Sequence, residues 1–456
     1  MCNARRDYTS AIGMTRRASY PYNPRMQTQA LPGFRDFYPE DLAVRTYIFD
    51  TWRTVATRYG FEEYDGPPLE PLDLYTAKSG EEIVGQLYNF TDRGDRAVAL
   101  RPEMTPTLAR MVASQAGKLR KPIRWFSIPQ LFRYERQQRG RLREHFQLNC
   151  DLIGEAGPLG DAELIALAVD IMRAFGLGPK DVRVRLSDRR VLTAILKGRG
   201  VPASAMGKAF EYIDKIERMR KAQSEQSGPM TEAFAPATAQ DLWEVSQIRD
   251  WTKLEKELAQ SDPGAIDNLR AVQQSLVAMG LGDFIEVDLT IVRGLAYYTG
   301  TVFELFDAGR TLRAICGGGR YDDLLQAVGG VQMPAVGFGM GDVVLGELLR
   351  EKRRSPSDRS IIDVFLAFIT RDDVPHAMRL AHELRDAGLR VEYALSFQAV
   401  GKQLKLADAR KARLAVVVGP DEWARGEVMM KDLRSGSQES VPANSLVNTI
   451  KARMNG

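Results

Sequence analysis

Residues 124–154 constrain the fold of this chain most strongly, because they have the pattern of a β-hairpin with one apolar and one polar face. The two predicted arms, 123–135 and 145–153, are rich in β-branched, aromatic and aliphatic residues. Side chains alternate along a strand, so His145, Gln147, Asn149 and Asp151 share one face of the second arm.

The loop between the two arms carries Arg136, Arg139, Arg141 and Arg143. A solvated, salt-bridged outer face is the alternative interpretation of such a hairpin. Repulsion among so many arginines favours an anionic partner, so the hairpin predicts a binding site for an anionic ligand.

Four short blocks occur in a fixed order along the chain. They are LRPEMT at residues 100–105, FRYER at 132–136 with the later pairs GR at 140–141 and FQ at 146–147, VRGLAYYTG at 292–300, and CGGGRYD at 316–322. The second block resembles motif 2 of class II aminoacyl-tRNA synthetases. Together, in this order and at this spacing, the four blocks resemble the histidyl-tRNA synthetase family from about Leu31 to the C-terminus.

The resemblance implies an α+β catalytic domain built on an antiparallel sheet, with an inserted α-helical domain and a C-terminal α/β domain. The patterns agree, since residues 191–282 are helical without strand alternation and short apolar strands alternate with helices after residue 361. The expected segments are a disordered basic tail (1–30), the catalytic domain in two parts (31–190 and 283–352), the helical insertion (191–282), a linker (353–360) and an anticodon-binding α/β domain (361–456).

Composition excludes several classes of protein. No run approaches the roughly 18 uninterrupted apolar residues of a membrane span, so no membrane association is expected. The three cysteines are far apart, which argues against a disulfide framework or a zinc site and favours a reducing, cytoplasmic setting. With only three histidines, the chemistry must depend on arginines, carboxylates and backbone.

The net charge of +4 comes from the first 30 residues, which hold five arginines against a single aspartate. The rest of the chain is balanced, so any polyanion must bind through local patches such as the arginine-rich loop. Three interpretations of the tail stay open, namely a disordered arm, a transit peptide, or residues upstream of a start at Met26. We favour a disordered arm that takes no part in the chemistry.

The resemblance also implies the substrates and the catalytic residues. It gives ATP, L-histidine and tRNA(His) as partners, with Mg²⁺ carried by ATP and no protein-bound metal. Arg133 and Arg293 are the expected catalytic residues, both contacting the α-phosphate, and Arg293 stands where related enzymes place a metal ion. Glu135 is expected to meet the adenine, and Arg141 the outer phosphates.

The expected histidine site takes residues from three parts of the chain. Gln147, Glu103 and Thr105 would hold the α-ammonium group, while Asp151 and Tyr298 would read the imidazole, whose two ring nitrogens such a pair can satisfy. The complete expected set is Glu103, Met104, Thr105, Gln147, Asp151, Arg293, Tyr297 and Tyr298.

A long helix over residues 40–59, followed by an extended run to residue 70, resembles class II motif 1, which forms the dimer interface in the family. A homodimer is therefore expected. The alternative is an ordinary amphipathic helix that packs on its own sheet, and periodicity does not separate the two.

The chain departs from the family pattern at several positions. Met104 replaces a usual glycine, and Asp151 replaces a usual glutamate, which shortens its reach by one methylene. Motif 3 usually reads GLER, but residues 337–345 read GFGMGDVVL, with no arginine in register. Asp342, at the start of the following helix, is expected to cap that helix or to orient one of the arginines 133, 141, 143 and 293.

The missing arginine keeps two other functions open. One is a non-catalytic histidine-binding paralogue, such as the regulatory subunit of ATP phosphoribosyltransferase, and the other is an RNA-binding sensor module. The first usually lacks the C-terminal domain, and neither needs Arg133, Arg141 and Arg293 together. The sequence therefore favours a histidine–tRNA ligase.

Overall fold

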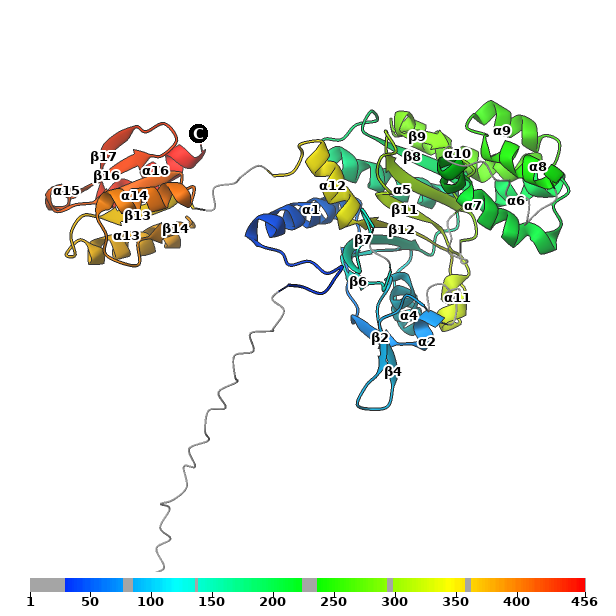
Figure 1. The fold of residues 1–456 in the computed structure, drawn as a ribbon, viewed down its shortest axis with the longest axis horizontal. Coiled ribbons are helices and arrows are strands. Elements are labelled where there is room, and N and C mark those ends of the chain that lie inside the picture. Colours follow the sequence, from blue (N-terminus) through cyan, green and yellow to red (C-terminus); the bar gives the residue numbers. More distant parts are fainter. Residues whose placement is uncertain are drawn as a thin grey trace, which may run out of the picture. The chain divides into compact units, whose positions relative to one another are not determined.

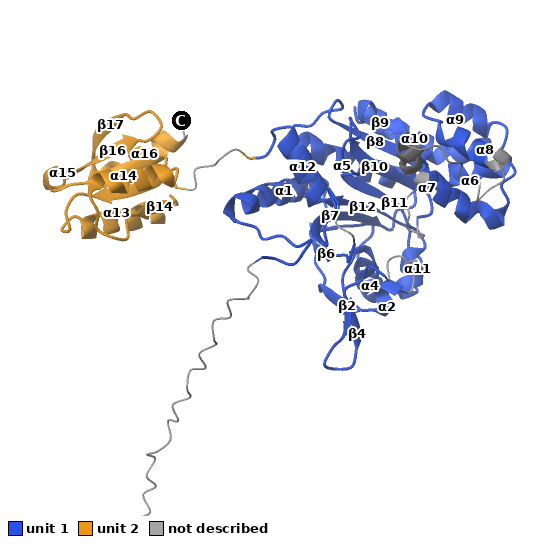
Figure 2. Cartoon of the chain, viewed as in Figure 1, with its two compact units in different colours: residues 1–355 blue, residues 356–456 orange. Residues whose placement is uncertain are grey.

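The computed structural model describes residues 29–76, 85–135, 138–223, 236–292, 298–356 and 362–455. The chain forms two compact units, and the boundary between them falls between Ser355 and Pro356 (Figure 2). The expected tail over residues 1–30 lies outside the described residues except for its last two positions. None of the described helices combines the length and apolar character that crossing a bilayer requires.

The first unit is built on a nine-stranded sheet (Figure 1). Its strand order is β1-β5-β7-β12-β11-β10-β8-β9, and β6 pairs with β7 beside that path. Neighbours are antiparallel except at the two ends, where β1 with β5 and β8 with β9 are parallel. The strands are β1 (Glu62–Glu63), β5 (Ile123–Ser127), β6 (Gln130–Phe132), β7 (Glu144–Ile153), β8 (Val182–Asp188), β9 (Ile285–Val287), β10 (Thr301–Asp307), β11 (Cys316–Arg320) and β12 (Ala335–Gly341). The predicted α+β class with a mainly antiparallel sheet is confirmed.

The predicted hairpin is present, but its first arm is shorter and is broken in two. Strands β5 and β6 both pair with β7, and the break between them falls at Ile128 and Pro129. Proline has no N–H to donate to a ladder, which explains the interruption. Regular strand structure ends at Phe132, so Arg133 and Glu135 lie just beyond the arm rather than within it.

Helix α5 (Pro158–Ala174) lies at the centre of the hydrophobic core of the first unit. Proline occupies its first turn, and Gly176, with φ of 73°, follows its end. Residues 164–169 are each no more than 1% exposed, as expected for a helix that is apolar on nearly every side. Helix α1 (Pro39–Arg58), helix α10 (Asp267–Ala278) and strands β7 and β12 pack around it.

The region between β8 and β9 is helical wherever the structure describes it. Two of its helices, α6 and α9, begin at polar caps, since Asp188 and Asp250 accept hydrogen bonds from the backbone N–H groups of Arg190 (2.8 Å) and Lys253 (3.0 Å). The elements are α6 (Arg189–Gly198), η1 (Ala203–Ala205), α7 (Met206–Gln223), α8 (Pro236–Ser246), α9 (Trp251–Leu258), η2 (Pro263–Ile266), α10 and η3 (Gly282–Phe284).

Smaller elements complete the first unit. Helices α4 and α11 pack against each other, and α12 follows directly after β12. A three-stranded sheet has the order β2-β4-β3. The bounds are β2 (Leu69–Pro71), α2 (Asp73–Thr76), β3 (Asn89–Thr91), β4 (Ala97–Leu100), α4 (Thr105–Gln115), α11 (Leu324–Gly329) and α12 (Asp342–Glu351).

The second unit is a separate α/β domain with its own core. Its five-stranded sheet has the order β14-β13-β15-β16-β17, with the first three strands parallel and the last two antiparallel. The predicted C-terminal α/β domain is therefore confirmed. The elements are β13 (Val364–Phe368), α13 (Val374–Asp386), β14 (Val391–Tyr393), α14 (Val400–Ala409), β15 (Leu414–Val418), α15 (Pro420–Ala424), β16 (Glu427–Asp432), β17 (Gln438–Pro442), η4 (Ala443–Ser445) and α16 (Leu446–Asn455).

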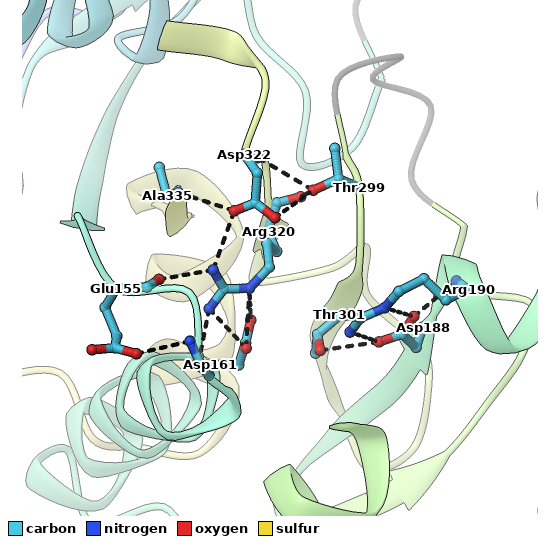
Figure 3. A network of polar contacts seen from close by, with 10 residues as sticks. Glu155, Asp161, Asp188, Arg190, Thr299, Thr301, Arg320, Asp322 and Ala335 are labelled. Atoms are coloured by element: carbon cyan, nitrogen blue, oxygen red, sulfur yellow. Dashed lines mark hydrogen bonds and ion pairs between the residues drawn. The ribbon is translucent and has the colours of Figure 1, made fainter. Parts of the chain in front are cut away.

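A buried arginine of the CGGGRYD block links several elements of the first unit (Figure 3). Arg320, 2% exposed at the end of β11, donates to the carboxylate of Asp161 in α5 (2.9 Å) and to the carbonyl of Glu155 (2.8 Å). It also pairs with Asp322 (3.2 Å), whose other oxygen accepts from the Thr299 hydroxyl (3.2 Å). These contacts anchor the end of the VRGLAYYTG block to the sheet.

We predict that Arg320→Met destabilises the first unit by about 3–5 kcal/mol, because the buried Asp161 would lose its counter-ion. Burial already raises the pKa of Asp161 to about 6, with Arg320 opposing that rise. Urea unfolding measures the effect. Arg96→Met, which removes an exposed arginine from its pair with Asp92, is the control and should leave the midpoint unchanged. Equal losses from the two substitutions would contradict this account.

Candidate active site

A cavity of about 620 Å³ opens where the hairpin, the sheet and the start of α12 meet. Four residues from the predicted site line it, namely Arg133, Glu135, Arg141 and Gln147. A larger cavity, of about 730 Å³, lies beside α6 and is lined by Arg189, Lys197 and Tyr298 among others. We take the first cavity as the candidate active site because it brings Arg133, Glu135 and Arg141 of the predicted ATP site together with Gln147 of the predicted histidine site. Asp151 is not among the residues that line either cavity, and Tyr298 lines the larger one.

Three glycines form a bare surface on two neighbouring strands, which we call the glycine floor: Gly319 in β11, and Gly337 and Gly339 in β12. A Cβ atom on Gly337 would overlap the carboxylate of Asp151. A Cβ on Gly339 would lie 2.7 Å from the side-chain amide of Gln147, and one on Gly319 would lie 2.9 Å from the ring of Tyr298.

The register of the sheet brings the predicted imidazole ligands together. Gly319 and Gly337 are direct partners across the β11–β12 pair, so Tyr298 and Asp151 lie over adjacent positions of the glycine floor. Gln147 lies over the next glycine of β12 in the same direction, because residues two apart on a strand share a face. The floor thus holds a carboxylate, a phenol ring and an amide side by side.

Asp151 is the buried carboxylate of this group, at 3% exposure. Its Oδ1 accepts a hydrogen bond from the hydroxyl of Tyr321, and within the described part of the chain its Oδ2 has no hydrogen-bond partner. Burial raises the pKa of Asp151 to about 7, and the Tyr321 hydroxyl opposes the rise. An unsatisfied buried acceptor is costly, and it marks a place where a ligand donor fits. Sequence reasoning missed Tyr321, although it belongs to the CGGGRYD block.

The predicted ATP ligands lie at the hairpin loop. Arg133 donates through Nε to the carbonyl of Pro102 (3.0 Å), which ties the LRPEMT block to motif 2. Glu135 and Arg141 form an ion pair with each other. Both guanidinium groups are therefore held near the cavity by oxygen acceptors of the protein itself.

The other predicted residues lie elsewhere or outside the described chain. Glu103, Met104 and Thr105 are at the start of α4 and are not among the residues that line the cavity. Met104 is fully buried and packs against Gly66. A Cβ atom added to Gly66 would lie 3.3 Å from the Cε atom of Met104. The predicted Arg293 and Tyr297 fall in residues 293–297, outside the described residues.

Asp342 does not act as expected. Its carboxylate accepts from Arg35 (2.9 Å) and from the backbone N–H of Phe146 (2.9 Å), and Arg35 also pairs with Glu144 (2.6 Å). It therefore neither caps α12 nor orients one of the arginines 133, 141 and 143. The expectation failed because Arg35 lies 307 positions away in sequence, beyond the reach of any local pattern.

His145 lines the cavity as a neutral imidazole. Burial first, and then the charges of Arg133, Arg35 and Arg141, lower its pKa to about 3. The positive charge of the cavity therefore belongs to arginines. Across the described ranges, no group of three or more side chains is arranged to hold a metal ion.

Comparison with known proteins divides the chain in the same way. Residues 33–341 match the family described as "Histidyl-tRNA synthetase", and residues 363–453 match "Anticodon binding domain". The "Histidine--tRNA ligase" of Opitutus terrae is 46% identical over 431 residues, which cover 93% of this chain and 98% of that protein. The "Histidine--tRNA ligase, chloroplastic/mitochondrial" of Arabidopsis thaliana is 41% identical over 414 residues, covering 91% and 85%.

A solved structure shows the same likeness in three dimensions. The crystal structure of histidyl-tRNA synthetase from Nostoc sp. PCC 7120 superposes with a TM-score of 0.79 at 27% identity. The match covers 94% of this chain and all of that one, at 100%.

We predict that Asp151→Asn removes a pH dependence of stability. The folded-state pKa of about 7 lies above the unfolded value of about 3.9, so the proton on Asp151 stabilises the fold at low pH. That stabilisation is lost as pH rises from about 4 to 7. The free energy of unfolding of Asp151→Asn relative to the original chain should therefore increase, on the order of 2 kcal/mol between pH 5 and pH 8.

Urea unfolding at the two pH values measures this difference. Asp50→Asn, at an exposed position of α1, is the control and should give a difference that does not change with pH. A constant difference for Asp151→Asn as well would contradict the buried, protonated carboxyl group.

Proposed function

The chain belongs to the histidyl-tRNA synthetase family and is a histidine–tRNA ligase, and from this premise we propose how its residues perform the reaction. Histidine and ATP form histidyl-adenylate, and the histidyl group then passes to the 3′ end of tRNA(His). The single observation that carries the proposal is the group of Asp151, Tyr298 and Gln147 over the glycine floor. Among the described residues, the Oδ2 atom of Asp151 in this group has no hydrogen-bond partner.

Histidine binds over the glycine floor. An imidazole N–H donates to Asp151, and Tyr298 meets the other side of the ring. Gln147 holds the α-ammonium end, with Glu103 and Thr105 contributing from the start of α4. An amino acid without a ring donor would leave the buried Oδ2 atom of Asp151 without a hydrogen bond, which is a strong basis for discrimination.

ATP binds along the hairpin loop. Arg133 contacts the α-phosphate, Glu135 meets the adenine, and Arg141 contacts the outer phosphates. Because Arg141 pairs with Glu135 in the structure, ATP binding exchanges a carboxylate partner for phosphate oxygens. After the proposed exchange of partners, Glu135 is available to accept a hydrogen bond from the adenine.

In the first step, a carboxylate oxygen of histidine attacks the α-phosphorus, and the bond to the bridging oxygen of pyrophosphate breaks. Arg133 and Arg293 stabilise the negative charge that develops on the phosphoryl oxygens. In the second step, a ribose hydroxyl at the 3′ end of tRNA attacks the histidyl carbonyl carbon, the bond from that carbon to the phosphate oxygen breaks, and AMP leaves with the hydroxyl proton on its phosphate. Neither step requires a histidine base, which fits the neutral state of His145.

Magnesium carried by ATP would supply positive charge for the outer phosphates. The carboxylates of Asp214 and Glu304 line the cavity and would lie beside such an ion.

Three further properties belong to the proposal. We propose a homodimer, from the resemblance of α1 and β2 to class II motif 1, and the second unit as the part that reads the anticodon. We also propose a cytoplasmic location, from the wide spacing of the three cysteines, of which Cys150 and Cys316 are buried.

The leading alternative is a non-catalytic histidine-binding paralogue. A structure whose title names an ATP phosphoribosyltransferase regulatory subunit/histidyl-tRNA synthetase has a TM-score of 0.70, but at 21% identity it shows only the shared fold. The anticodon-binding match over residues 363–453 favours the ligase.

We predict that the purified chain catalyses histidine-dependent exchange of pyrophosphate into ATP and charges tRNA(His). Each of the other standard amino acids serves as a control and should give background exchange. Histidine binding without exchange would replace the ligase with the non-catalytic paralogue.

We predict that Gln147→Ala raises the KM for histidine by about tenfold or more while the KM for ATP changes little, because one charged hydrogen bond is lost. Gln326→Ala, on the exposed side of α11, is the matched control. Equal increases in both KM values would show that Gln147 has only a structural role.

A further inference from the structure

Residues 312–316 run antiparallel to the segment where motif 3 has no arginine. Cys316 is the strand partner of Met340, and the backbone N–H of Gly341 donates to the carbonyl of Ile315 (3.2 Å). Strand β12 ends at Gly341, and Val343 and Val344 belong to the first turn of α12 that follows it. The two segments form adjacent parts of one wall of the 620 Å³ cavity, which Arg313, Val343 and Val344 all line.

The side chain of Arg313 extends toward the hairpin loop. Its Nη2 donates to the side-chain oxygen of Gln138 (2.6 Å). A Cβ built on Gly140 of that loop would lie 3.2 Å from Val344 Cγ2 and 3.7 Å from Arg313 Cδ. The side chains of Val344 and Arg313 therefore both lie close to Gly140, on the side to which its Cβ would point.

The backbone that carries Arg313 is held at both ends. Before it, the Asp307 carboxylate accepts from the N–H groups of Thr311 (2.9 Å) and Leu312 (2.9 Å). After it, the N–H of Ile315 donates to the carbonyl of Leu305 (2.8 Å). A side chain on such an anchored segment reaches a ligand with little cost of ordering the backbone.

We propose that Arg313 binds the outer phosphates of ATP, supplying from the β11 side of the wall the guanidinium that motif 3 lacks. This inference rests on the proposed function of the cavity. Arg133, Arg141 and Arg313 are the arginines that line the described part of this cavity, and they approach it from the hairpin loop and from the neighbouring wall. A triphosphate between them is contacted from two sides, and phosphate oxygens are stronger partners for a guanidinium than the amide oxygen of Gln138.

Histidine-dependent pyrophosphate exchange by Arg313→Ala tests the proposal. The KM for ATP should rise about 10- to 100-fold, since a charge-assisted contact is lost, while the KM for histidine stays within about twofold. Arg313→Lys should lie between the two, because it keeps the charge without the planar fork. Arg313 is exposed, so folding of the variant is not expected to suffer.

Arg310→Asn is the matched control. Arg310 lies on the same turn and pairs with Glu286 (3.1 Å), but it is not among the residues that line the cavity. Its φ of 54° is one that asparagine adopts more readily than most residues, so the charge is removed without added backbone strain. This variant should keep the original KM for ATP, and a rise equal to that of Arg313→Ala would overturn the assignment.

Direct binding identifies the phosphates concerned. Calorimetry with ATP and with AMP should show that Arg313→Ala weakens ATP binding while AMP binding is unchanged. Equal weakening of both nucleotides would place Arg313 at the α-phosphate or the nucleoside and overturn the proposal. If the original chain is active in exchange and Arg313→Ala has an unchanged KM for ATP, the role assigned to Arg313 is refuted and the proposed function stands. If the original chain is inactive, the proposed function itself is refuted.

Discussion

The site depends on the close packing of three side chains against the glycine floor. Side chains on β11 or β12 at Gly319, Gly337 or Gly339 would occupy the space now taken by Tyr298, Asp151 and Gln147. Glycine weakens a strand, so a sheet with bare central positions needs support from elsewhere. Helix α5 supplies it from the core beneath, and the Arg320 contacts supply it at the end of β11.

Two buried ion-pair groups hold the elements around the floor in place. Arg320 connects β11 with α5 and, through Asp322, with Thr299. Arg35 connects Glu144 at the start of β7 with Asp342 at the start of α12. Such groups contribute little net stability, but removing one partner leaves a buried charge. Asp151 is a further cost to stability, because burial disfavours the ionised form of its carboxyl group. A ligand that donates a hydrogen bond to this group would offset that cost.

The fold class and much of the site follow from local patterns. Strand alternation alone places Gln147 and Asp151 on one face, and the four sequence blocks are sufficient to identify the family. The ATP ligands that these blocks predict remain a prediction, and Arg133, Glu135 and Arg141 among them line the cavity. Partners that depend on sheet register or distant chain segments did not follow from sequence. Tyr321 reaches Asp151, and Arg35 reaches Asp342, only after strands far apart in sequence have paired. The position of Arg313 beside motif 3 likewise follows only from the pairing of β11 with β12.

A crystal structure of the chain with bound L-histidine tests the central claim most directly. The account predicts the imidazole beside Asp151, with a ring N–H within hydrogen-bond distance of its carboxyl group and the α-ammonium group beside Gln147. Histidine bound in the cavity beside α6, near Arg189 and Lys197, with Asp151 still contacting only Tyr321, would contradict it.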